Sequence, residues 1–218
     1  VVESPFESET RCLVVVPGNL PDPKAPDARE RVADVCVEAV RAAGGRTLCL
    51  FTSWRGLEAA HRALQIAQLP WAVMCQGDAP RGDLIRRFRE DETSILLGVA
   101  SFWEGIDVRG AALSCVFIDR LPFTPPNDPL ADAMHDRDPR GWFGAWYLPR
   151  AVIAFKQGAG RLIRSESDCG AMVIADRRIV HSRYGPQFLG ALPGYCAFGD
   201  LLDDIAPFID AAARRLAA

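Results

Sequence analysis

The stretch TLCLFTSWRGLEAAHRALQIAQLPWAVMC, residues 47–75, indicates how the chain folds. Its first five residues form an apolar run that predicts a buried strand. From about Ser53, apolar residues recur every three or four positions, which predicts a helix with one buried face. A second apolar run, 71–75, predicts another strand. Because a helical crossover joins parallel strands, this stretch predicts a parallel sheet covered by helices.

The same alternation continues on both sides of this stretch. Further strands are expected at 12–16, 94–100, 113–118 and 171–175, and further helices at 27–43, 83–90 and about 150–164. Asp27 and Glu30 form a capping-box pattern at the start of the first of these helices. Continuous apolar strands separated by helices are typical of a sheet buried on both faces. We therefore expect an α/β protein with three layers and a mostly parallel sheet.

The length of 218 residues corresponds to a single domain at about 100–200 residues per domain. We divide it into a lead-in strand with a Pro-rich segment (1–26), a core (27–193) and a C-terminal helical tail (194–218). Charged residues make up 24% of the chain and hydrophobic residues 49%, which excludes a disordered or collagen-like protein. The net charge of −3 excludes a uniformly basic surface for nucleic acid.

Several further absences narrow the class of protein. No apolar run approaches the roughly 20 residues of a membrane helix, and the acidic first ten residues do not resemble a signal peptide, so we expect a cytoplasmic protein. The seven cysteines lie at least 13 positions apart, which excludes the usual spacing of zinc and iron–sulfur ligands and predicts reduced thiols. The two lysines, Lys24 and Lys156, lie outside any GxxxxGK[ST] phosphate loop. A first residue of Val1 rather than Met suggests a piece of a longer chain.

The segment QGAGRLIR, which starts at Gln157, is the strongest candidate for chemistry. In a helix, Gln157, Arg161 and Arg164 would share one face, and two guanidinium groups with a carboxamide can clamp a phosphate. Gly158 and Gly160 would each cost about 1 kcal/mol relative to alanine in that helix, which indicates close approach of another element or a ligand. Two arginines on a solvated surface are the alternative interpretation.

Three other candidates follow predicted strands, where a parallel sheet binds its ligands. The loop SFWEGID, 101–107, offers a hydroxyl, an aromatic ring and two carboxylates for a ribose, a metal-bound water or a nucleic-acid backbone; a turn with Trp103 in the core is the alternative. Ser53 and Trp54 stand at a helix start, where Ser53 acts either as a phosphate contact or as a plain helix cap. Gln76, after the strand at 71–75, is equally ambiguous.

Four strings resemble the C-terminal motor domain of the DinG/XPD group of superfamily-two helicases. They are TLCLFTSW (47–54), SILLGVASFWEGIDVRG (94–110), VFIDRLPFTPPNDP (116–129) and KQGAGRLIRSESDCGAMVIADRR (156–178), in the order and spacing of that group's motifs IV, V and VI. The resemblance extends from about residue 4 to about residue 193, and the last string is highly specific. It implies a RecA-like fold and an ATP-driven helicase that moves 5′ to 3′ on single-stranded DNA.

Carried over by position, the resemblance implies a role for each candidate residue. The catalytic group, which would reach the phosphates of ATP, is Gln157, Arg161 and Arg164. The residues implied to border the ATP are Glu104, Gly105, Asp107 and Gly160. The residues implied to contact DNA are Ser53, Trp54, Gln76, Ser101 and Trp103, with the two tryptophans as base-stacking candidates.

The group's phosphate-loop lysine, DEAH-type box and iron–sulfur cysteines belong to its N-terminal half, and none occurs in this sequence. The resemblance therefore implies that an N-terminal motor domain holds most of the ATP and Mg²⁺, that any 4Fe–4S cluster lies there, and that this chain alone is inactive. One alternative is a stand-alone nucleic-acid- or partner-binding module without ATPase activity. Another is an unrelated enzyme using Cys or His, although His61, His135 and His181 have no nearby nucleophile motif.

Overall fold

The computed structural model describes residues 11–99, 102–103, 113–125, 128–163, 168–194 and 196–216. Within them, a seven-stranded sheet has the order β3-β4-β2-β5-β6-β1-β7, and every neighbouring pair runs parallel. The strands are β1 (Cys12–Val15), β2 (Thr47–Leu50), β3 (Val73–Cys75), β4 (Ile95–Gly98), β5 (Cys115–Ile118), β6 (Gly170–Ile174) and β7 (Cys196–Gly199). The helices are α1 (Ala28–Ala42), α2 (Trp54–Ala67), α3 (Arg81–Glu90), α4 (Pro129–Arg137), α5 (Leu148–Ala159), α6 (Arg178–His181), α7 (Gly185–Leu189) and α8 (Ile205–Leu216).

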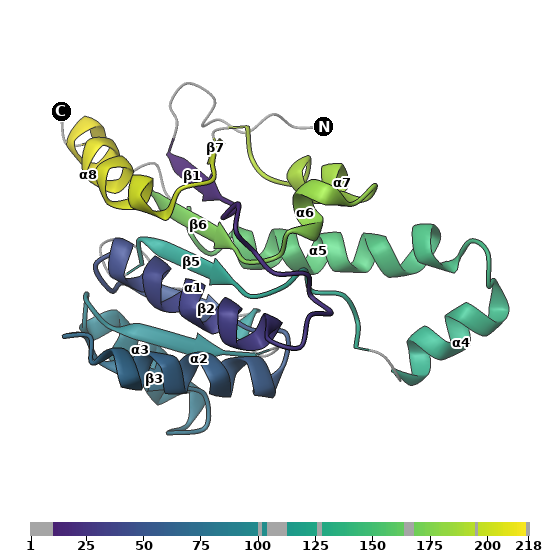
Figure 1. Ribbon diagram of the computed structural model, residues 1–218, viewed down its shortest axis with the longest axis horizontal. Coiled ribbons are helices and arrows are strands. Elements are labelled where there is room, and N and C mark those ends of the chain that lie inside the picture. Colours follow the sequence, from purple (N-terminus) through teal and green to yellow (C-terminus); the bar gives the residue numbers. More distant parts are fainter. Residues whose placement is uncertain are drawn as a thin grey trace.

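Helices cover both faces of the sheet (Figure 1). Alternate strand residues point to opposite faces, so Leu48 and Leu50 join the core beneath α3, α5, α6 and α7. Cys49 and Phe51 join the second core, beneath α1, α2 and α8. The expected three-layer α/β fold is confirmed.

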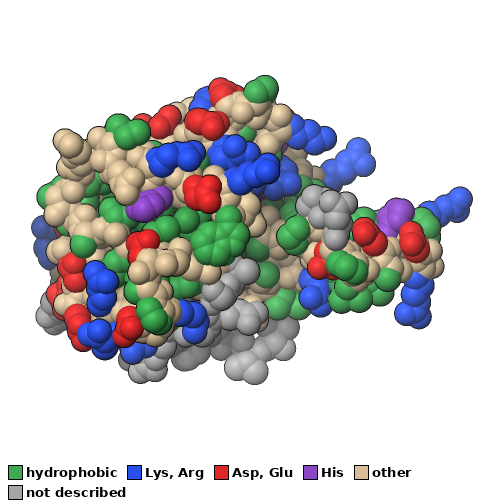
Figure 2. Space-filling view, turned by 90° about the horizontal axis from the view of Figure 1, so that it is seen from below, with side chains coloured by type: hydrophobic (Ala, Val, Ile, Leu, Met, Phe, Trp, Pro, Cys, Tyr) green, Lys and Arg blue, Asp and Glu red, His purple; other side chains and the backbone are tan. Residues whose placement is uncertain are grey.

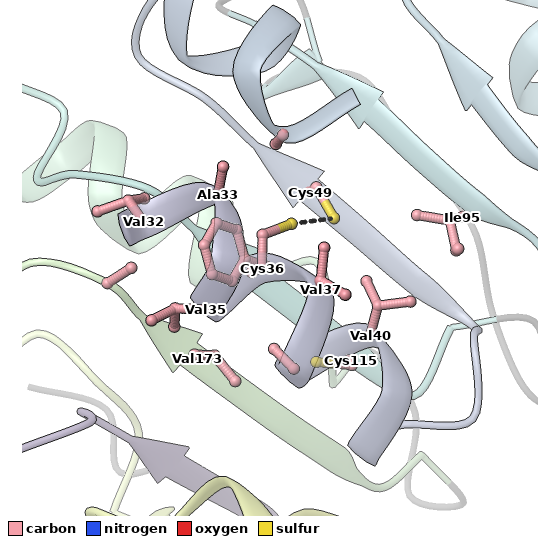
Figure 3. Close-up of a cluster of buried hydrophobic side chains, with 14 of the residues drawn as sticks. Val32, Ala33, Val35, Cys36, Val37, Val40, Cys49, Ile95, Cys115 and Val173 are labelled. Atoms are coloured by element: carbon pink, nitrogen blue, oxygen red, sulfur yellow. Dashed lines mark hydrogen bonds between the residues drawn. The ribbon is translucent and has the colours of Figure 1, made fainter. Parts of the chain in front are cut away.

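Helix α1 packs against the sheet through the face that its sequence predicts (Figure 3). Val32, Val35, Cys36 and Val40 are all buried, and the Sγ atoms of Cys36 and Cys49 lie 3.7 Å apart. All seven cysteines are free thiols. Burial raises the pKa of the Cys49 thiol well above its ordinary value, which keeps it protonated and makes it a small apolar side chain.

Three local expectations were wrong. The capping box does not form, because the Asp27 side chain makes no cap hydrogen bond to α1. Helix α5 ends at Ala159 rather than near residue 164. The tail at 194–218 contains β7 as well as α8. Strand β7 is short and only partly buried, and its pairing is with the distant β1, so no local apolar run announces it.

An arm of helix projects from the sheet (Figure 1). It comprises α4, the π-helical turn Phe143–Tyr147 and the first turns of α5. At its base, the centroid of the Phe123 ring lies 5.3 Å from that of Tyr147 and 5.7 Å from that of Phe188.

Acidic and basic side chains are interspersed over the face seen in Figure 2. Within the described ranges, no helix is long and apolar enough to cross a membrane.

Candidate functional site

The carboxyl ends of β2 and β5 and the outer face of α5 surround a cavity of about 420 Å³. Phe51 and Thr52 follow β2, and a Pro-rich loop follows β5. Ligands of parallel sheets bind at this edge. The residues that line the cavity are Phe51, Thr52, Trp103, Pro122, Phe123, Thr124, Pro125, Arg150, Ile153, Ala154 and Gln157.

A buried carboxyl group joins the ends of the two strands. Asp119, directly after β5, is 2% exposed. Its Oδ1 accepts the N–H of Thr52 at 2.8 Å, and its Oδ2 accepts the Thr52 hydroxyl at 3.2 Å. Burial raises the pKa of Asp119 to about 7, although the hydrogen bonds from Thr52 and the charge of Arg120 oppose that rise. The carboxyl therefore fixes the chain entering α2.

Ser53 is the N-cap of α2, as one of the two interpretations requires. Its Oγ accepts the N–H of Gly56 at 3.2 Å. The next residue, Trp54, is 49% exposed although its ring is large and apolar. An exposed indole at a strand end is a suitable platform for a base, because every base has a face on which an aromatic ring can stack.

The arginine segment is not the helical stripe that its spacing suggests. Gln157 lies in α5 and is exposed, whereas Gly160 is the C-cap and Arg161 lies in the following turn. The Arg161 Nε–H donates to the carbonyl of Trp103 at 3.2 Å. Tertiary contact, rather than helical periodicity, thus holds Arg161 against the backbone of Trp103, one of the residues that line the cavity. Arg164 lies outside the described residues.

The assignment of Trp103 as a base-stacking residue was wrong. Trp103 is only 6% exposed, and its Nε1–H donates to the carbonyl of Phe51 at 3.2 Å. The indole N–H and the Cε3–Cζ3 side of the ring are both in contact with the fold, so the core alternative holds. The other loop candidates, Ser101, Glu104, Gly105 and Asp107, lie outside the described residues.

Gln76 also has a structural task. Its Oε1 accepts the N–H of Val99 at 2.7 Å, which ties the end of β3 to the end of β4. Two further residues at the site, Asp119 and Arg150, were not among the candidates from the sequence. Asp119 directly follows an apolar strand, so the same strand-end rule would have found it. Arg150 stacks on Trp146, 4.9 Å from the ring centroid, and because these residues lie four positions apart in helical chain, the spacing itself offered a local signal for the contact.

Similar solved structures define the class of protein fold to which this chain belongs. An XPD helicase superposes with a TM-score of 0.62 at 21% identity, over 87% of this chain and 35% of that chain. Dbp5 of S. cerevisiae, bound to RNA and ADP BeF3, superposes with a TM-score of 0.56 at 15% identity, over 97% of this chain and 46% of that chain. The parallel sheet with its strand-end loops is therefore a RecA-like helicase fold.

Residues 36–195 match the helicase C-terminal domain family, and the chain belongs to that family. ATP-dependent DNA helicase YoaA of Escherichia coli K12 is 42% identical over 199 residues, and ATP-dependent helicase DinG of Mycobacterium tuberculosis H37Rv is 36% identical over 221 residues. The alignments cover 88% and 99% of this chain but 31% and 32% of the relatives. The resemblance to the DinG/XPD group is confirmed, and the chain spans about a third of these relatives' length.

Proposed function

We propose that this chain is the second motor domain of an ATP-dependent helicase that moves 5′ to 3′ on single-stranded DNA. Family membership supports this proposal, as do relatives that are named ATP-dependent helicases. In the proposed motor, an N-terminal domain of the same protein holds the phosphates of ATP and the Mg²⁺. The present chain completes the catalytic site from the opposite side.

The contact between Arg161 and the Trp103 carbonyl carries this proposal. It joins the segment that resembles motif VI to the segment that resembles motif V, next to the cavity. Phosphoryl transfer depends on positive charge placed around the transferring group. Arg161 and Arg164 would supply that charge and Gln157 would orient it, while Glu104, Gly105, Asp107 and Gly160 would border the nucleotide.

The test is ATP hydrolysis by the longer protein that contains this chain. An arginine finger contributes roughly 10³–10⁵ in rate, so R161A should lower kcat at least about 10³-fold. The matched control is R41A, which removes an exposed arginine from the last turn of α1, on the other face of the sheet. Full turnover by R161A would refute the proposed role of Arg161.

The proposed DNA path begins at the end of β2 and crosses the cavity. Trp54 would stack on a base of the DNA. Contacts with the DNA backbone would come from Ser53, Gln76 and Ser101. Arg150, which lines the cavity, would add a positive charge. Stacking contributes about 1–3 kcal/mol per base, so W54A should weaken binding of an oligo-dT strand by about 5- to 150-fold. The control is I66A, at the far end of α2, where the side chain is 82% exposed.

This binding test uses the present chain and fluorescence anisotropy at two salt concentrations. Affinity should be weak and should fall as salt rises, because released counterions drive contacts with phosphates. Equal affinity of W54A and the unsubstituted chain would remove Trp54 from the path. Affinity without salt dependence would contradict a backbone-tracking site.

We propose that the metal cofactors of the motor lie outside this chain. The described residues contain no group of three or more His, Cys, Asp or Glu side chains positioned to hold a metal ion. The resemblance to the DinG/XPD group, rather than this observation, is the reason why we propose that Mg²⁺, and any 4Fe–4S cluster, is held by the N-terminal part. The proposed location of the motor is the cytoplasm, where its DNA substrate would lie.

A further inference from the structure

We infer that Trp103 is a positioning residue that holds Arg161 in register with the end of β2. The inference rests on the proposed function of Arg161, and it adds a residue that acts through that arginine rather than on ATP. Three contacts of Trp103 carry it: one through the indole N–H, one through the ring and one through the backbone carbonyl.

The indole N–H fixes one side of the residue. It donates to the carbonyl of Phe51 at 3.2 Å. Phe51 directly precedes Thr52, whose N–H is held by the buried Asp119, and Ser53 then caps α2. The ring is thus anchored to the same short segment that presents Trp54 to solvent.

The Cε3–Cζ3 side of the ring packs on α5. A Cβ atom on Gly158 would lie 2.7 Å from Cε3 and 2.8 Å from Cζ3 of Trp103. Only glycine allows the helix to approach the ring this closely. The contact gives a physical reason for a glycine at a helical position, where it costs stability relative to alanine.

The backbone carbonyl of Trp103 then sets the arginine. It accepts the Nε–H of Arg161, two residues beyond the end of α5. A ring that is 6% exposed and packed on two elements has little room to shift. Movement of the end of β2 relative to α5 therefore displaces the carbonyl that orients Arg161.

The experiment is a double-mutant cycle on DNA-stimulated ATP hydrolysis, in the longer protein that contains this chain. W103F keeps a ring against Gly158 but removes the N–H that bonds Phe51. R161K keeps the charge but removes the Nε–H that bonds Trp103. We expect W103F to lower kcat about three- to tenfold, as loss of one hydrogen bond predicts, with less than a twofold change in the KM for ATP.

The decisive comparison is between the effect of W103F on kcat in the unsubstituted protein and its effect in the R161K variant. If Trp103 acts through Arg161, W103F should have less than a twofold effect on kcat in the R161K background. G158A provides a second route, since it displaces the same ring from the helix side with the indole N–H intact, and it should show the same dependence on R161K. W71F is the control, because Trp71 precedes β3, at the amino-terminal ends of the strands, whereas the candidate site lies at their carboxyl ends.

The possible failures are distinguishable. Unchanged turnover in R161A would refute the proposed function of Arg161 itself, whereas unchanged turnover in R161K, which keeps the charge, would refute only the positioning role. A loss in R161K together with equal factors for W103F in both backgrounds would refute the positioning role and leave the proposed function standing. An unchanged kcat in W103F and G158A would also refute the positioning role. Unfolding midpoints of each variant, measured by circular dichroism, would show whether a loss of turnover reflects unfolding instead, which would count against the inference.

Discussion

Substitution of Gly158 by alanine tests the closest packing contact at the site. The added Cβ would lie 2.7 Å from the Trp103 ring and 3.3 Å from Cδ1 of Leu50. Overpacking of this kind costs about 1–3 kcal/mol, while alanine gains up to about 1 kcal/mol over glycine in a helix. G158A should therefore change the free energy of unfolding by about 0–2 kcal/mol, in the destabilising direction.

G82A isolates the packing cost. Gly82 lies in α3, and a Cβ there would meet nothing within 4 Å. Both glycines are near helix ends, so the propensity gain is similar and cancels in the comparison. The difference between the two variants should be about 1–3 kcal/mol, or about 2–12 °C in Tm for a chain of this size.

The assay is urea unfolding of the chain followed by far-ultraviolet circular dichroism, with thermal unfolding as a second measure. G82A should be as stable as the unsubstituted chain or more so, and G158A less stable than G82A. Stability of G158A equal to or greater than that of G82A would mean that the Trp103 ring yields freely. The close approach would then not explain the glycine.

Three further predictions concern stability. Because the folded carboxyl of Asp119 keeps its proton to about pH 7, whereas an unfolded one loses it near pH 4, the folded state binds more protons in this window and its stability should fall as pH rises from about 4 to 7; D119N should show a smaller fall in urea titrations. S53A should cost about 0.5–2 kcal/mol of unfolding free energy through loss of the α2 cap, and S53G only a few tenths. R178A should cost up to about 3–5 kcal/mol, because the Asp176 carboxylate is 1% exposed and bonds Arg178 at 2.6 Å, although the Arg178 side chain is itself 34% exposed; in the same titrations, a cost below 1 kcal/mol would contradict this.

The fold was largely predictable because its signals are local. Strands β1 to β6 each follow from an apolar run, and α1 to α3 from helical periodicity with a clear end, such as the positive φ angles of Gly44 and Gly45 after α1. Strand β7 escaped prediction because it is half exposed at the sheet edge and is specified by pairing with β1. The arm escaped because the ring contacts that fix its base join Phe123 to Tyr147 and Phe188, which are distant in the sequence.

The candidate site was predicted as a set of loops but not as a geometry. The strand-end rule and the motifs selected Ser53, Trp54 and Arg161, and it was the structure that separated exposed Trp54 from buried Trp103. The helical spacing of Gln157 and Arg161 was misleading, because α5 ends between them. Composition and spacing carry no information on where a helix stops against a neighbouring ring.

The amino-acid sequence by itself determined the layered α/β class, the membership in the DinG/XPD group and the end of the sheet at which the candidate site lies. It could do so because the spacing of apolar residues and the order of motifs are read directly along the chain. The tertiary structure alone decided that Gly158 admits the Trp103 ring, that this ring bonds Phe51, and that the Trp103 carbonyl orients Arg161. These contacts join positions 52 to 58 residues apart. Their geometry depends on how α5 packs on the sheet, which no local pattern encodes.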